Sequence, residues 1–237
     1  MTANDAANNA SAGPVRTAEA LYRDVAKLAE RDPKNKDLLE AQIHGATHLI
    51  SLYARSKELT KAQSLFDEIT EAISKNPDIP GFREMKAGVA VPLSAAYGTA
   101  GFIDKVRDIY NEIKGIAEQF PNEPELREYQ VNIAVNLSID YMNKKQIADA
   151  TDIYREISTI AKNYPNQLAI QREQGRILVL LIFHYTEETD DIKSARELYH
   201  RLAQLAVAHP EETFFRRAQA DAAVSIIAKI DEMEEED

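Results

Sequence analysis

Apolar residues recur at helical spacing in two neighbouring segments near the middle of the chain. In residues 126–142 they are Tyr129, Ile133, Leu137 and Tyr141. In residues 147–163 they are Ala150, Tyr154, Ile157 and Ala161. Side chains three or four residues apart share one face of a helix, so each segment is predicted to be an amphipathic helix. The turn between the two segments is short, and we therefore expect the helices to lie antiparallel.

The same helix pair recurs along the chain. The stretch DIYNEIKGIAEQFPN at residues 108–122 returns as DIYREISTIAKNYPN at residues 152–166, which is 44 residues later. Prolines that end the second helix of each pair recur at intervals of 44, 44, 44 and 45 residues: Pro33, Pro77, Pro121, Pro165 and Pro210. Proline lacks an N–H and disfavours helical backbone in the residue before it, so it ends a helix.

A single hairpin of this kind cannot bury its apolar stripe, and stacking on neighbouring hairpins completes the core. No segment shows the alternation that is typical of a strand. The sequence therefore predicts an all-α fold, a right-handed α-solenoid of antiparallel helix hairpins with about ten helices. The predicted repeat domain covers residues 15–232, between a disordered tail at residues 1–14 and an acidic tail at residues 233–237.

Four positions in each repeat resemble the tetratricopeptide repeat (TPR), which has Leu and Tyr on its first helix and Ala and Phe or Tyr on its second. In one repeat they are Leu49, Tyr53, Ala62 and Phe66, and in another Leu137, Tyr141, Ala150 and Tyr154. The period is longer than the usual period of that family, which is about 34 residues. The resemblance implies a superhelix whose first helices line a concave groove for a peptide or a partner helix.

By position in the repeat, the resemblance assigns eight residues to this groove. They are Asn132, Val135, Asn136, Ile139, Arg176, Val179, Leu180 and Phe183. Several of them are apolar, although a helix face turned toward solvent should be polar. Such a face either binds a partner or is buried when copies of the chain associate.

Three arginines form a candidate subsite for an anion, such as an acidic or phosphorylated group. Arg172 and Arg176 are neighbours on one helix face, and Arg217 has the position of Arg172 one repeat later. Stacked helices lie about 8–10 Å apart, so the three guanidinium groups could converge. Alternatively, the arginines pair with carboxylates on the same surface, for which Glu128, Glu173 and Asp221 are the candidates.

Two further features suggest chemistry. Glu40, His44 and His48 are spaced along one helix face, but they span about 12 Å, which is too far for one metal ion. We interpret His44 and His48 as surface residues and only as a weak candidate metal pair. Gly88 and Pro92 are predicted to kink the helix at residues 81–99, and the small side chains there form either a notch for a partner's bulky side chain or a simple bend.

Composition narrows the possible functions. The net charge of −11 argues against nucleic acid, which requires a concentrated basic face. There is no cysteine, so thiolate catalysis and zinc sites built on cysteine are excluded. The chain also lacks a glycine-rich phosphate loop, a nucleophile elbow and an H-E-x-x-H motif, and we expect no enzyme activity and no cofactor. No membrane-spanning stretch or signal peptide is recognisable, which favours a cytoplasmic location.

These features favour a non-catalytic adaptor or scaffold that binds an extended peptide or an amphipathic helix of a protein partner in the groove. Two alternatives remain open. The chain could be a structural repeat protein that self-associates into a homo-oligomer, or a helical domain that binds a small molecule or a metal ion.

Overall fold

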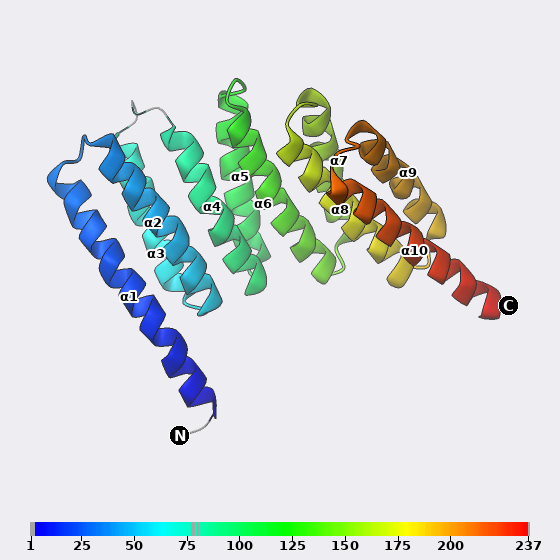
Figure 1. Ribbon diagram of the computed structural model, residues 1–237, viewed down its shortest axis with the longest axis horizontal. Coiled ribbons are helices and arrows are strands. Elements are labelled where there is room, and N and C mark those ends of the chain that lie inside the picture. The colour runs from blue at the N-terminus through cyan, green and yellow to red at the C-terminus, as the bar shows by residue number, and fades with distance from the viewer. Residues whose placement is uncertain (1–2, 77–78, 80, 237) are drawn as a thin grey trace. The chain divides into compact units, whose positions relative to one another are not determined.

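The computed structural model describes residues 3–76, 79 and 81–236. This part of the chain contains ten helices and no strand, so the predicted all-α fold is confirmed (Figure 1). The helices are α1 (Ala3–Arg31), α2 (Lys36–Arg55), α3 (Leu59–Ser74), α4 (Phe82–Thr99), α5 (Ile103–Gln119), α6 (Pro124–Asn143), α7 (Ile147–Asn163), α8 (Leu168–Glu187), α9 (Ile192–Ala208) and α10 (Thr213–Glu236). None of them is long and apolar enough to cross a membrane.

The chain forms two compact units. Unit 1 comprises Met1–Ile133 and unit 2 comprises Ala134–Asp237, so the boundary falls inside α6. In unit 1, α2 packs against α1, α3 and α4, and α4 packs against α3 and α5. In unit 2, α8 packs against α7, α9 and α10, and α9 packs against α10. Each unit is therefore built by the stacking of neighbouring hairpins.

The repeated apolar columns form the cores of the units. The leucine column of the first helices is buried throughout, as Leu49, Leu93, Leu137, Leu181 and Ile226. The aromatic column of the second helices is buried at Tyr22, Phe66, Tyr110 and Tyr154, and half-buried at Tyr199. The same positions therefore make the same contacts in successive hairpins.

The turn inside each hairpin has a residue in the left-handed backbone conformation at the same repeat position. This residue is Lys57, Gly101, Lys145 or Asp190, with φ between 55° and 81°. In the first turn, the amide of Glu58 donates to the carbonyl of Tyr53 (2.8 Å), and that of Lys57 donates to Ala54 (3.1 Å). These two bonds define a Schellman motif, which satisfies the last carbonyls of a helix.

The last of these turns contains the extra residue of the 45-residue interval. The hydrogen bond that closes this turn runs from the amide of Asp191 to the carbonyl of Tyr185. It spans one residue more of the chain than the corresponding bond of the other turns. The insertion is thus absorbed in a surface turn, and α9 keeps its buried Ala195 and Leu202.

Helix α1 extends beyond the predicted start of the repeat domain, since it begins at Ala3 and continues through Pro14. Five of the first 14 residues are alanine, the residue with the highest helix propensity, which explains the extension. At the other end, α10 continues to Glu236 through most of the predicted acidic tail.

The notch predicted at Gly88 is occupied within unit 1. Helix α4 runs continuously past Pro92, and a Cβ atom at Gly88 would lie 3.4 Å from the ring of Tyr129. Glycine therefore lets the Tyr129 side chain approach α4, and the space is not open to a partner's side chain.

Tyr154→Ala should lower the free energy of unfolding by about 3–5 kcal/mol, because the ring is buried between hairpins and its removal leaves a cavity. Urea denaturation measures this loss. The exposed residue Lys162 on the same helix provides the control, and Lys162→Ala should change stability by less than about 0.5 kcal/mol. A loss below about 1 kcal/mol for Tyr154→Ala would contradict the stacking of hairpins.

Lys57→Gly should raise the free energy of unfolding by about 0.5–1 kcal/mol. Left-handed backbone costs a residue with a Cβ atom about 1–2 kcal/mol, and glycine avoids most of this cost. The control is Lys75→Gly, because Lys75 ends α3 with an ordinary φ of −75° and the change should destabilise the protein there. Thermal unfolding of both variants measures the difference, and the expectation fails if both shift in the same direction.

Candidate functional site

A cleft between α6, α8 and α10 of unit 2 has walls that are mainly apolar. Its volume is about 410 Å³. Its walls are Ile139 of α6, Val179 and Leu180 of α8, and Phe214 and Ala218 of α10, with Arg176, Arg217 and Asp221 as the polar residues. Ile139, Val179, Leu180 and Phe214 are each half-buried, so they present apolar surface to the cleft. Four of the predicted groove residues therefore lie together here: Ile139, Arg176, Val179 and Leu180.

Gly175 brings α10 close enough to form one wall of the cleft. A Cβ atom at Gly175 would lie 3.0 Å from the ring of Phe215 and 3.1 Å from that of Phe214. Real side chains rarely tolerate such distances, so any larger residue would push the start of α10 outward. The two phenylalanine rings meet edge to face, with centroids 5.2 Å apart. Phe215 is fully buried and holds Phe214 at the cleft.

The sequence pattern did not predict that Phe214 and Ala218 line the cleft. The repeat pattern could have indicated Phe214, because Phe215 belongs to a buried apolar column. The residue next to a buried one on a packed helix lies on the neighbouring face of that helix. The position of Phe214 relative to Val179 and Leu180 depends on how closely α10 approaches α8, and the repeat pattern does not determine this distance.

The three arginines of the predicted anion subsite are each paired with a carboxylate. Arg172 donates to Glu212 through Nε (3.0 Å), Arg176 donates to Glu173 (2.8 Å), and the Nε of Arg217 lies 3.7 Å from Asp221. Arg176 and Arg217 line the cleft, whereas Arg172 does not. The geometry therefore favours the alternative of surface ion pairs, with Glu212 in place of Glu128 as the partner of Arg172.

Glu173, like Glu212, is half-buried. Burial raises the pKa of its carboxyl group, while the nearby Arg176 guanidinium lowers it. A half-buried carboxylate that accepts from a single arginine depends on that arginine for its charge compensation. Arg176 is thereby held at the edge of the cleft.

Two further residues of the predicted groove, Val135 and Phe183, do not line the cleft. Val135 is only 1% exposed, so its assignment to an accessible groove is wrong. Helix α6 is buried over most of its circumference at this level, since Val131, Ile133 and Ala134 are buried as well. Phe183 is half-buried but does not line the cleft.

The two predicted asparagines also lie outside the cleft. Asn132 belongs to unit 1, and its side-chain amide donates to the carbonyl of Glu128 (2.9 Å) in the same helix. Asn136 is half-buried on α6. His44 and His48 are exposed on α2. Among the described residues there is no group of three or more side chains suited to hold a metal ion.

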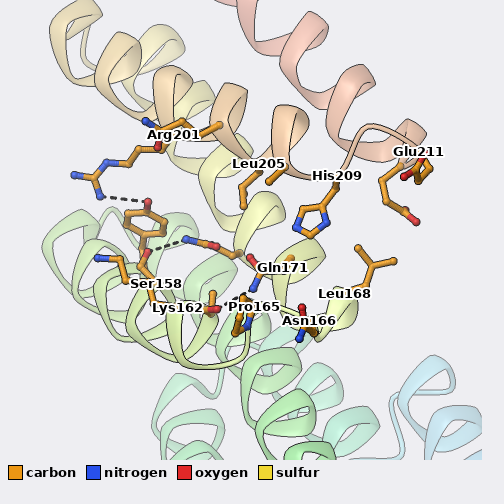
Figure 2. Close-up of a pocket in the computed structure, with 16 residues that line it drawn as sticks. Ser158, Lys162, Pro165, Asn166, Leu168, Gln171, Arg201, Leu205, His209 and Glu211 are labelled. Carbon is orange, nitrogen blue, oxygen red and sulfur yellow. Dashed lines mark hydrogen bonds between the residues drawn. The ribbon is translucent and has the colours of Figure 1, made fainter.

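A larger cavity of about 880 Å³ lies between α7, α8 and α9, and its lining combines polar and apolar surface in similar amounts (Figure 2). Arg201 and His209 come from the α9 side and face Ser158 and Gln171 across it, as Figure 2 shows. These polar groups are engaged with the protein itself. Arg201 donates to the Tyr154 hydroxyl (3.4 Å), and Gln171 donates to the carbonyls of Ala161 (2.9 Å) and Tyr164 (3.2 Å).

Similar grooves follow the second helices in unit 1. One of about 610 Å³ lies between α1 and α3 and includes Arg23 and Lys61, and another of about 420 Å³ lies between α3 and α5 and includes Gln63 and Lys105. Since such grooves lie between α1 and α3, between α3 and α5 and between α7 and α9 with different side chains, we interpret them as a consequence of stacking. The cleft at α6, α8 and α10 differs because its walls are apolar.

Comparison with known proteins gives one match. A family model of the PPR repeat matches residues 46–72, which lie in α2, the following turn and α3. PPR repeats are TPR-like helical repeats that generally bind protein or RNA and are generally non-catalytic, so the match supports a helical-repeat protein. No curated protein and no solved structure matches the chain.

Arg176→Ala should lower the free energy of unfolding by about 1 kcal/mol near pH 7 and by less near pH 4. Because burial raises the pKa of Glu173, the stability associated with this group is present at low pH and is lost as the pH rises through the folded-state pKa. Removal of Arg176 raises that pKa further and deepens the loss. Urea denaturation at both pH values measures the effect.

The matched control is Arg217→Ala, because Asp221 is exposed and the pair is long. Its effect should stay below about 0.5 kcal/mol at both pH values. If Arg176→Ala costs the same at pH 4 and pH 7, the arginine acts through packing alone and not through the charge of Glu173.

Proposed function

We propose that the chain is a non-catalytic adaptor whose unit 2 binds a short peptide segment of a protein partner in the cleft between α6, α8 and α10. The observation that carries the proposal is the set of half-buried apolar side chains from three helices, Ile139, Val179, Leu180 and Phe214, around one opening. Apolar surface that the chain leaves accessible in a concave site favours a partner that covers it.

The size of the cleft favours an anchoring side chain rather than a whole helix. A volume of about 410 Å³ accommodates one or two bulky apolar side chains. Burial of one such side chain contributes about 1.5–3 kcal/mol. This contribution has to be supplemented by polar contacts around the opening, since ordering a peptide is itself unfavourable.

The charges at the rim favour an acidic neighbour of the anchor. Arg176 is compensated by Glu173, so the basic group that the rim offers to a ligand is Arg217. Arg217 is exposed and only loosely paired, at 3.7 Å from Asp221, so it can exchange this partner for a carboxylate of the peptide. The preferred peptide therefore combines a bulky apolar residue with Asp or Glu.

The match to the PPR repeat favours RNA as a second candidate, because RNA is the typical partner of these repeats. The matched residues belong to unit 1, whereas the residues that line the cleft belong to unit 2. The acidic net charge opposes this candidate, since a phosphate backbone has to be neutralised by basic side chains. A peptide therefore remains the proposed ligand.

Selection from a random peptide library on the purified chain should yield peptides with a bulky apolar residue next to Asp or Glu. In a fluorescence titration, Val179→Arg should weaken these peptides by at least about tenfold, because a charged side chain then fills the cleft. Arg217→Glu, at an exposed site, should weaken the acidic peptides by about threefold to tenfold through charge reversal.

The matched control is Val207→Arg, because Val207 is an exposed valine on α9 outside the cleft, and binding should be unchanged. All variants are compared with the parent chain by thermal unfolding. The proposal is wrong if Val179→Arg leaves peptide binding unaltered. It is also wrong if a pool of single-stranded RNA binds at physiological salt while no peptide does.

A further inference from the structure

The last helix of unit 2, α10, exposes a stripe that the other first helices bury. The stripe consists of Ala220, Ala223, Ile227 and Ile230 at helical spacing. Ile227 is 65% exposed, and Ile230 and Ala220 are exposed as well. At the repeat position of Ile227, the preceding first helices have the fully buried residues Ile50, Ser94, Ser138 and Ile182.

The way α2 buries its stripe shows what α10 lacks. In unit 1, α2 packs against the second helix of its own hairpin, α3, and against the next first helix, α4. The corresponding stripe of α2 is Ile43, Ala46, Ile50 and Tyr53, all of it buried. In the described part of unit 2, α10 packs against α8 and α9, which precede it. No described helix takes the place beside α10 that α3 and α4 have beside α2.

Helix α1 of unit 1 has the complementary exposed stripe. It has the pattern of a second helix, and Ala18, Leu21, Val25 and Leu28 form its stripe. Leu21 is 64% exposed and Leu28 is 48% exposed. The equivalent residues of α3 include Ala62, Leu65 and Ile69, which are buried where α2 packs against α3. Helix α1 has no first helix before it in the described residues.

We infer that the chain associates head to tail with a second copy of itself, in that α10 of one copy packs antiparallel against α1 of the next. The exposed stripe of a helix of the first type and the exposed stripe of a helix of the second type together complete one hairpin. The hairpin of α2 and α3 is the internal template, with Ile227 in the place of Ile50 and Leu21 in the place of Leu65.

Copies joined in this way use two different surfaces, and each pair leaves one α1 and one α10 uncovered. Such a heterologous contact continues to add copies unless it closes into a ring. Each copy carries −11, and the resulting repulsion opposes association at low salt. Added salt screens this repulsion and strengthens the apolar contact.

Sedimentation velocity of the full chain tests the inference over a concentration range from about 1 to 200 μM, a range that covers the weak affinities of small apolar interfaces. The mass of the wild-type chain should rise with concentration and rise further with added sodium chloride. Ile227→Arg and Leu21→Arg each block one of the two surfaces and should remain monomeric throughout. Both residues are exposed, so the variants should keep the wild-type melting temperature.

Val207→Arg is the matched control. Val207 is 80% exposed, but the equivalent residues Ser74, Glu118 and Lys162 are polar and exposed, so this position faces solvent in every repeat. Its mass should follow that of the wild-type chain. A wild-type chain that stays monomeric at all concentrations and salt levels would overturn the inference, as would a control variant that loses association.

Mixing the two blocked variants tests the direction of the contact. Ile227→Arg retains a functional α1, and Leu21→Arg retains a functional α10, so an equimolar mixture should form dimers of one copy each and nothing larger. Dimers of either variant alone would show a symmetric contact instead and would overturn the head-to-tail arrangement. The peptide-binding cleft is intact in all these variants, so the outcome is independent of the proposed peptide binding.

Discussion

The structure depends on the burial of two apolar stripes, one on each helix of a hairpin, by the helices that come before and after it. No helix of this length and polarity is stable alone in water, because most of its stabilisation comes from packing of the apolar face. The columns that carry Leu137 and Tyr154 recur in each hairpin and are buried throughout, except that Tyr199 is half-buried. Stability is therefore distributed as a series of similar contacts between neighbours.

The same constraint separates structural from functional surface. Where a helix has a neighbour on each side, as α2 does, its stripe is buried and carries no ligand. Where the stacking leaves apolar residues accessible, as at Val179 and Phe214 or at Ile227 and Leu21, something else has to cover them. The first pair lies in a concave cleft that suits a side chain, and the second pair lies on flat helix faces that suit another helix.

Charge acts at a second level. Arg172, Arg176 and Arg217 of unit 2 are paired with carboxylates on the same surface, so they do not converge into a strong anion site. Paired and solvent-exposed charges contribute little to stability, and in the proposed function Arg217 gives the nearby cleft its preference for an acidic partner. Arg176 has the additional task of compensating the half-buried Glu173.

Periodicity is a local property of a chain, and it was enough to predict the helices, the hairpins and the buried columns such as Leu49 and Tyr154. The resemblance to the TPR placed Ile139, Val179 and Leu180 in one candidate site. The burial of Val135 and the ring of Tyr129 against Gly88 could not be predicted from periodicity. Each depends on how closely a neighbouring helix or turn approaches, and that distance is decided only when segments far apart in the sequence pack together.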